Sequence, residues 1–112
     1  MVESKAKQQY EEVKEEIRSL GWARPGSVTR RYMPCGNPSC HCMAEPPQLH
    51  GPYYQWSHKI RGKTHSLRLS EAQVRQCREW SANHKRLKKL LRRLEALALR
   101  ETDRLLGAIS RS

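Results

Sequence analysis

The sequence predicts an α+β fold, in which a small three-stranded antiparallel sheet with a zinc-bound loop lies between an N-terminal helix and a long C-terminal helix. Three patterns support this prediction: helical spacing of apolar residues near both ends, alternation of apolar and polar residues in the middle, and clustered cysteines in a proline-rich loop. We expect an N-terminal amphipathic helix at 1–21, a zinc-binding β domain with the start of the next helix at 22–80, and a basic, leucine-rich helical extension at 81–112.

The composition limits the hydrophobic core that this fold can build. Only 37% of the 112 residues are hydrophobic and none is phenylalanine, and the mean hydropathy is −0.90. A small domain buries a small share of its surface. Such a chain usually needs a metal, a disulfide or a partner to be stable.

Residues 2–20 have the spacing of an amphipathic helix. Its apolar stripe consists of Tyr10, Val13, Ile17 and Leu20. Gly21 is placed to end the helix, because glycine readily adopts the left-handed conformation found after many helices.

The middle of the chain predicts three strands. Residues 27–33 have the composition of a strand, and residues 53–60 and 63–69 read as a hairpin turning at Arg61-Gly62, which suits a two-residue type I′ turn. In this register Trp56 faces Leu67. The face expected to be buried carries Tyr54, Trp56, Ile60, Leu67 and Leu69. The opposite, polar face carries Tyr53, Gln55, Ser57, Lys59, Thr64, Ser66 and Arg68.

A long second helix should follow the hairpin. Ser70 and Gln73 form a capping box at its start, and Gly107 can end it after about Leu106. Its first half can pack on the hairpin through Val74, Cys77, Trp80 and Ser81. Its second half carries a stripe of Leu87, Leu91, Leu94, Ala98 and Leu105, widened by Leu90 and Leu97. A helix this long needs a partner, which can be the N-terminal helix, a second copy of the chain, or both.

Four residues of the middle loop are the predicted zinc ligands: Cys35, Cys40, Cys42 and His50. Structural zinc takes four Cys or His ligands in a tetrahedron. Cys40 and Cys42 point the same way in extended chain, whereas His41 between them points away. His50 directly precedes the hairpin, so the metal would tie the loop to the sheet.

Other interpretations of this loop stay open at the level of sequence. They are three thiols without a metal, a redox pair that includes Cys40, an iron–sulfur cluster, and zinc with His41, His58, His65 or Cys77 as its fourth ligand. A closed site rich in thiolates is structural rather than catalytic. Only Glu45 supplies a carboxylate near the motif, so we expect no enzymatic activity.

The motifs Cys-Gly-Asn-Pro-Ser-Cys-His-Cys and Leu-His-Gly-Pro-Tyr-Tyr, followed by a Gly-Lys-Thr hairpin, resemble those of an uncharacterised family of short bacterial and archaeal proteins. Its members share Cys-Gly-Lys-Pro-x-Cys-x-Cys, His-Gly-Pro-Tyr-Tyr and a trailing charged helix. The resemblance spans about residues 24–95, and Asn37 stands where lysine is common. It implies no particular activity. The signature positions that it marks are Cys35, Cys40, Cys42, His50, Gly51, Pro52 and Tyr53.

The positive charge is concentrated after the first helix. Residues 1–20 carry four Lys or Arg against five Glu, whereas residues 21–112 carry 18 against six acidic residues. Such an excess indicates a polyanionic partner. The candidate contacts on the sheet are Arg30, Arg31, Tyr53, Gln55, Lys59, Arg61, Lys63 and Arg68. Those on one face of the long helix are Lys85, Lys88, Lys89 and Arg92.

These observations favour a zinc-stabilised, non-catalytic protein that binds nucleic acid. We favour duplex DNA, because the chain lacks the aromatic motif and the arginine-rich tract of common RNA binders. An accessory role in mobile-element or phage DNA machinery is one setting for such a protein. The alternatives are a protein-interaction module that uses the leucine stripe, as a homodimer or with another protein, and a basic surface without a specific ligand.

No export signal or membrane-spanning segment is visible in the sequence. The first residues are polar, and no stretch approaches the roughly 20 apolar residues of a membrane span. We therefore expect a cytoplasmic protein without a membrane partner. Thiols stay reduced in the cytoplasm, which favours metal binding over disulfides for the cysteine cluster.

Overall fold

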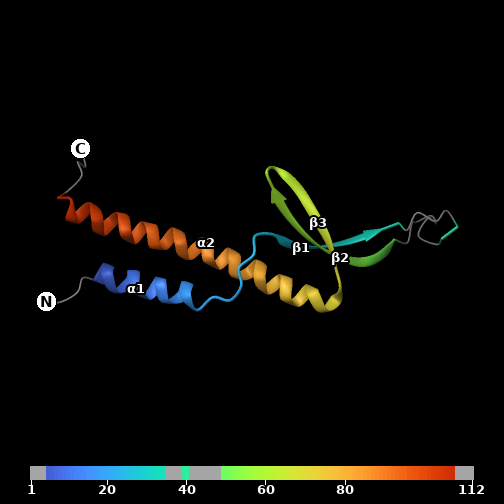
Figure 1. The fold of residues 1–112 in the computed structure, drawn as a ribbon, viewed down its shortest axis with the longest axis horizontal. Coiled ribbons are helices and arrows are strands. Elements are labelled where there is room, and N and C mark those ends of the chain that lie inside the picture. The colour runs from blue at the N-terminus through green and yellow to red at the C-terminus, as the bar shows by residue number, and fades with distance from the viewer. Residues whose placement is uncertain (1–4, 35–38, 41–48, 108–112) are drawn as a thin grey trace. The chain divides into compact units, whose positions relative to one another are not determined.

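A computed structural model of the chain describes residues 5–34, 39–40 and 49–107 (Figure 1). Its elements are α1 (Lys5–Arg18), β1 (Ser27–Met33), β2 (His50–Ile60), β3 (Lys63–Leu69) and α2 (Glu71–Leu105). The expected α+β class is confirmed: in the described part of the chain, an antiparallel sheet of order β1-β2-β3 follows α1 and precedes α2 in sequence. Two compact units are present: the sheet unit, Arg24–Ser81, and the helical unit, Met1–Ala23 with Ala82–Ser112.

The β2–β3 hairpin has the register that the alternation of side chains predicts. Trp56 lies opposite Leu67, and Tyr54 lies opposite Leu69. Arg61 and Gly62 in the turn have φ angles of 50° and 81°. Two successive positive φ angles are the requirement of a type I′ turn, so both the turn and the register are confirmed.

Strand β1 has the predicted bounds and pairs with β2. Val28 lies opposite Trp56, and the register shifts between Arg31 and Met33. Met33 then pairs with His50, the first residue of β2. The segment that carries the cysteine cluster therefore leaves and re-enters the sheet at neighbouring positions.

The core of the sheet unit is small and centres on Trp56. This side chain is 2% exposed and packs with Leu69, Val74 and Cys77. Val28, Tyr54 and Trp80 pack around the cluster and are partly buried. The first turns of α2 therefore cover the sheet face that the alternation predicts to be apolar.

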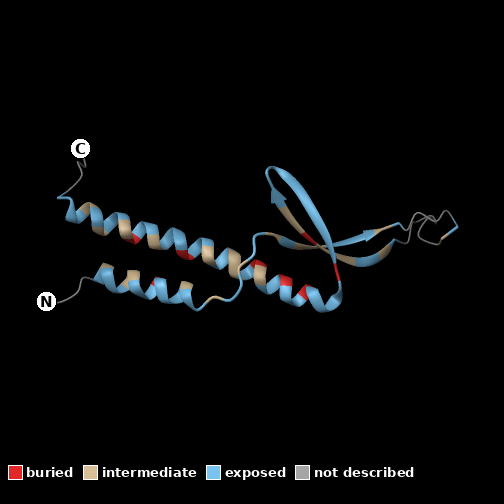
Figure 2. Cartoon of the chain, viewed as in Figure 1, coloured by how far each residue is buried: buried red, intermediate tan, exposed pale blue. Residues whose placement is uncertain are grey.

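The apolar face is buried over only part of the hairpin, which corrects the expectation for Ile60 and Leu67. They are 48% and 60% exposed, and Figure 2 shows exposed residues around the hairpin turn. A helix is about 10 Å wide, whereas a strand advances about 3.3 Å per residue. One helix crossing the strands therefore covers only about three residues of each, and the turn end stays in water.

Gly26 closes the core of the sheet unit against Trp56. A Cβ atom added at Gly26 would lie 2.5 Å from the Trp56 ring, and the φ angle of Gly26 is 140°. Ser81 Oγ donates a hydrogen bond of 2.7 Å to the Gly26 carbonyl. The Arg24 N–H donates to the Trp80 carbonyl at 3.2 Å. These contacts hold the chain tightly over the indole.

We therefore expect Gly26→Ala to lower the free energy of unfolding by about 2 kcal/mol, because the added methyl group overpacks the Trp56 ring and strains the backbone. Urea denaturation would measure the change. Gly21→Ala is the matched control, since a Cβ there meets only the Asn83 side chain, at 3.3 Å. Equal stability of the two variants would contradict this account of the core.

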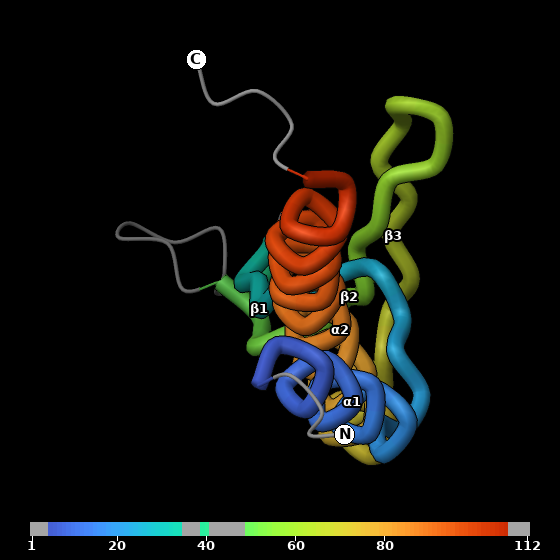
Figure 3. The backbone as a smooth tube through the Cα atoms, turned by 90° about the vertical axis from the view of Figure 1, so that its left-hand side faces the viewer, coloured from blue at the N-terminus to red at the C-terminus, as the bar shows by residue number. Residues whose placement is uncertain are grey.

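In the helical unit, α1 packs against α2, which provides the long helix with one of its expected partners. Figures 1 and 3 show α1 running beside the C-terminal part of α2. Val13, Leu90 and Leu97 are buried at the centre of this contact. The side chains around them are partly buried and comprise Tyr10, Ile17, Leu20 and Leu94. The predicted stripe of the first helix is thus confirmed.

The leucines of α2 that meet α1 differ from the expected seven-residue set. Leu90 and Leu97, predicted only to widen the stripe, are its buried centre, whereas Leu91 and Leu105 are 42% and 68% exposed. Successive residues turn by about 100° around a helix, so Leu91 lies well away from Leu90. Contact with a single helix buries only the narrow strip that includes Leu90.

The residues predicted at the two ends of α2 are confirmed, whereas the residue predicted to end α1 is not. The Ser70 N–H donates to Gln73 Oε1 at 2.8 Å and the Gln73 N–H donates to Ser70 Oγ at 3.3 Å, which confirms the capping box. Gly107, with a φ of 74°, follows the end of α2 as expected. Gly21 has no positive φ, so its predicted role is wrong. Instead, Ser19 Oγ donates to the Glu16 carbonyl at 2.8 Å near the end of α1.

Candidate nucleic-acid and metal sites

The polar side of the sheet gathers cations from all three strands. Arg31 lies opposite Tyr53, and Gln55 lies opposite Arg68. We call this surface the basic face and define it by Arg31, Tyr53, Gln55, Lys59 and Arg68. The described strands β1, β2 and β3 contain no Asp or Glu. Their positive charge therefore has no acidic neighbour within the strands.

Tyr53 and Arg68 form an ordered pair on the basic face. The Arg68 guanidinium lies 4.1 Å from the centre of the Tyr53 ring, which is within cation–π distance. Beside them is an open depression of about 400 Å³. Its lining residues are Gly51, Pro52, Tyr53, Tyr54, Arg68, Leu69 and Glu71. The Tyr53 ring thus orients the planar guanidinium of Arg68, a hydrogen-bond donor, beside this depression.

The other sheet candidates lie elsewhere. Arg30 is opposite Tyr54 and Lys63 is opposite Ile60, so both belong to the same side of the sheet as Trp56. The Arg30 guanidinium lies 5.9 Å from the centre of the Tyr32 ring. Arg61 is in the turn. A single ligand on the basic face would therefore reach neither Arg30 nor Lys63.

A second basic surface lies on the part of α2 that belongs to the helical unit. It is a shallow groove of about 420 Å³, which we call the basic groove, lined by Ala82, Lys85, Arg86, Lys89 and Arg92. Arg86 is neutralised by Glu16 at 3.0 Å. The remaining cations of the groove form no ion pair within the described ranges. Lys88, the fourth predicted contact on this helix, is exposed but does not line the groove.

Two of the four predicted zinc ligands come together. Cys40 Sγ lies 3.0 Å from His50 Nε2, and both residues are partly buried. Zinc bonds of about 2.3 Å to sulfur and about 2.0 Å to nitrogen place tetrahedral ligand atoms roughly 3.5 Å apart. A small opening of this contact would therefore admit the ion. The two described ligands are therefore compatible in spacing with the predicted site.

Cys35 and Cys42 lie outside the described residues, as does His41. Within the described ranges, no group of three or more His, Cys, Asp or Glu is arranged to hold a metal. His58 and His65 stack across the hairpin with ring centres 5.8 Å apart. Cys77 is buried in the core beside Trp56. The contact between Cys40 and His50 thus favours His50 among the histidines considered as ligands.

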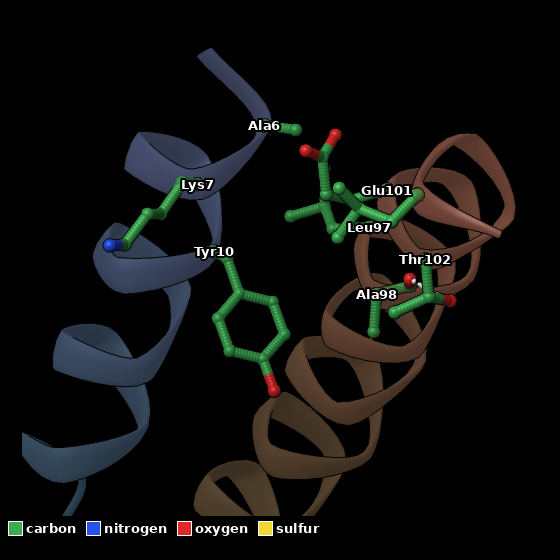
Figure 4. Close-up of a pocket in the computed structure, with 8 residues that line it drawn as sticks. Ala6, Lys7, Tyr10, Leu97, Ala98, Glu101 and Thr102 are labelled. Atoms are coloured by element: carbon green, nitrogen blue, oxygen red, sulfur yellow. Dashed lines mark hydrogen bonds between the residues drawn. The ribbon is translucent and has the colours of Figure 1, made fainter. Parts of the chain in front are cut away.

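An apolar groove of about 310 Å³ lies between α1 and α2 in the helical unit. Figure 4 shows the Tyr10 ring pointing into the space between the helices, with Leu97, Ala98 and Glu101 across from it. Arg104 donates a hydrogen bond of 2.6 Å to the Glu101 carboxylate, which lowers the pKa of Glu101. None of the described helices is both long enough and apolar enough to cross a membrane.

Trp22 was not among the predicted contacts, yet its side chain is 82% exposed. A single tryptophan in a linker carries no pattern that separates a buried side chain from an exposed one. Only the packing around it decides between the two.

Comparison with known proteins places the chain in a family. No similar curated protein and no similar solved structure was found. A family model described as Domain of unknown function (DUF6788) matches residues 3–79, more than half of the chain. The match includes α1, the sheet and the start of α2, whereas the motif resemblance predicted a span of about 24–95. The chain therefore belongs to the family described as Domain of unknown function (DUF6788).

Proposed function

We propose that the protein is a zinc-stabilised, non-catalytic module that binds nucleic acid, with duplex DNA as its preferred form. The observation that carries the proposal is the basic face. Arg31, Lys59 and Arg68 share one side of a sheet whose described strands hold no acidic residue. Like charges repel one another at this spacing, and a polyanion removes the repulsion while it releases counterions.

The shape and chemistry of the basic face suit the major groove of DNA. That groove admits a two-stranded β ribbon, and the β2–β3 hairpin with its exposed turn has this form. Arg68 can donate two hydrogen bonds to the edge of guanine, and the Gln55 amide can both donate to and accept from adenine. These two side chains are directly opposite each other, so they would read adjacent positions.

The basic groove has a different role in this proposal. Lys85, Lys89 and Arg92 are flexible cations on a helix surface, without aromatic or amide groups among the groove residues. Such residues hold phosphates and carry no sequence information. The sheet would then supply sequence preference, and the groove would supply affinity.

Zinc has a structural role in this proposal. Cys40 and His50, together with Cys35 and Cys42, would bind one ion where the cysteine segment meets β2. His50 lies three residues before Tyr53 in the same strand. The ion would therefore stabilise the end of the basic face. We place the protein in the cytoplasm, and an accessory role beside mobile-element or phage DNA machinery fits a small basic module of this kind.

The proposal predicts duplex binding in the micromolar range or tighter at low salt, with a log–log salt slope near −0.9 per phosphate contacted. Lys59→Ala should weaken binding and reduce the slope by about 0.9. Lys63→Ala is the matched control, because it removes the same charge from the other side of the same hairpin. Arg68→Ala should also reduce the difference in affinity between cognate and random sequence. Fluorescence anisotropy with a labelled duplex across a salt series measures all three.

Equal effects of Lys59→Ala and Lys63→Ala would contradict the assignment of the basic face. A second candidate function is self-association through α2, which the exposure of Leu91, Leu99 and Leu105 favours, at 42%, 64% and 68%. A folded, zinc-loaded chain that binds neither DNA nor RNA at low salt but sediments as a dimer would favour this second function.

A further inference from the structure

Trp22 presents its indole to solvent from a backbone that is held in place. The side chain is 82% exposed. Asn83 Nδ2 donates a hydrogen bond of 2.8 Å to the Trp22 carbonyl. Two residues earlier, Leu20 packs on the cluster of Val13, Leu90 and Leu97. The packing of the helical unit therefore fixes the backbone at Trp22 and leaves its indole exposed.

Exposure of so large an aromatic surface gives up the stabilisation that burial provides. Tryptophan is also among the residues that contribute most to binding where a protein meets a ligand. The charges near its anchor on α2 indicate which ligand the surroundings of Trp22 would select.

The anchor of Trp22 on α2 lies level with one end of the basic groove along the helix axis. Asn83 does not itself line the groove, but it follows Ala82, which lines it with Lys85, Lys89 and Arg92. Ala82 and Arg92 are ten residues apart, which is about 15 Å along a helix. An exposed indole and a row of cations thus belong to the same part of the helical unit. An apolar protein surface would match the indole but leave the cations without partners.

We infer that Trp22 stacks on an unpaired base of a nucleic acid whose phosphates lie in the basic groove. This inference rests on the proposed function and specifies the form of nucleic acid that Trp22 contacts. Aromatic side chains beside a cationic groove are the usual combination in single-strand binding, because every base has a π face. Bases inside a duplex are already stacked on one another. We therefore expect Trp22 to stack on bases in a single strand, at a gap or at a frayed duplex end.

The test compares three labelled probes of equal length at one salt concentration: a single-stranded oligonucleotide, the same backbone with abasic residues, and a blunt duplex. Trp22→Ala should weaken binding of the single strand roughly tenfold. It should leave binding of the abasic strand and of the duplex unchanged, since those contacts involve phosphates alone. Trp22→Tyr should restore part of the loss, whereas Trp22→Leu, which is apolar but has no π face, should not.

The possible outcomes separate this inference from the proposed function. Equal losses on the single strand and the abasic strand would overturn stacking while leaving nucleic-acid binding intact. Full affinity in Trp22→Leu would likewise overturn it, in favour of a simple apolar contact. If the wild-type chain binds none of the three probes, the proposed function fails and the inference fails with it. Circular dichroism of each variant checks that the helices are retained, as the exposure of Trp22 leads us to expect.

Discussion

Replacing Cys40 with serine is expected to abolish zinc binding and to unfold the sheet unit. Cys40 Sγ lies 3.0 Å from His50 Nε2, and His50 pairs with Met33 where β2 begins. A structural zinc site supplies on the order of 10 kcal/mol of folding free energy. Whole domains are stable by only about 5–15 kcal/mol. The buried core of the sheet unit, centred on Trp56, is too small to replace such a contribution.

Elemental analysis should find about one zinc per wild-type chain and none in Cys40→Ser. His50→Ala should behave in the same way, and chelation of wild-type zinc should reproduce the loss of structure by circular dichroism. Cys77→Ala is the matched control, because Cys77 is a buried apolar neighbour of Trp56 and is not one of the four favoured ligands. It should keep its zinc and lose about 1 kcal/mol of stability. Retention of the full fold by wild-type protein after complete removal of metal would refute the zinc site.

Replacing Trp56 with alanine is expected to lower the free energy of unfolding by about 3–5 kcal/mol. Trp56 is 2% exposed and contacts the cluster of Leu69, Val74 and Cys77. The chain at Gly26 also packs directly against its ring. Truncation would therefore leave a cavity in the only buried cluster of the described part of the sheet unit. Zinc-loaded protein in a urea titration followed by circular dichroism measures the loss.

Two further variants make this prediction specific. Leu67 faces Trp56 across the hairpin but is 60% exposed, so Leu67→Ala should cost about 1 kcal/mol or less. Trp56 Nε1 is buried without a hydrogen-bond partner among the described residues. Trp56→Phe removes that unsatisfied group together with part of the ring, so it should cost less than Trp56→Ala. Similar losses for Trp56→Ala and Leu67→Ala would mean that Trp56 is not the centre of the core.

Local sequence patterns were sufficient for the order of the elements, the hairpin register and the start of α2, but not for the end of α1 at Arg18 or the start of β2 at His50. The alternation around Trp56 and the Arg61-Gly62 turn predicted the hairpin register, because a slip by one residue would move every side chain to the other face. Ser70 and Gln73 predicted the start of α2 through hydrogen bonds that reach only three residues. These interactions form between near neighbours, so the chain encodes them without reference to the rest of the fold.

The candidate sites were predicted less completely, because they depend on which face a residue occupies. Alternation assigned Lys59 and Arg68 to the polar side of the hairpin. It placed Lys63 opposite Ile60 but gave no side for Arg30, and the strand pairing puts both on the side of Trp56. For zinc, the spacing of cysteines and histidines selected four residues, of which the described Cys40 and His50 are in contact.

The sequence by itself determined the order of the elements, the hairpin register and the caps of α2, since each depends on short-range hydrogen bonding or on strict side-chain periodicity. Only the tertiary structure decided how far burial extends. It left Leu67 in water because α2 covers part of the hairpin, and it buried Leu90 rather than Leu91 because α1 contacts one narrow strip of α2. It also left Trp22 exposed. The physical reason is that burial depends on which surfaces meet, and periodicity within one element does not specify its neighbour.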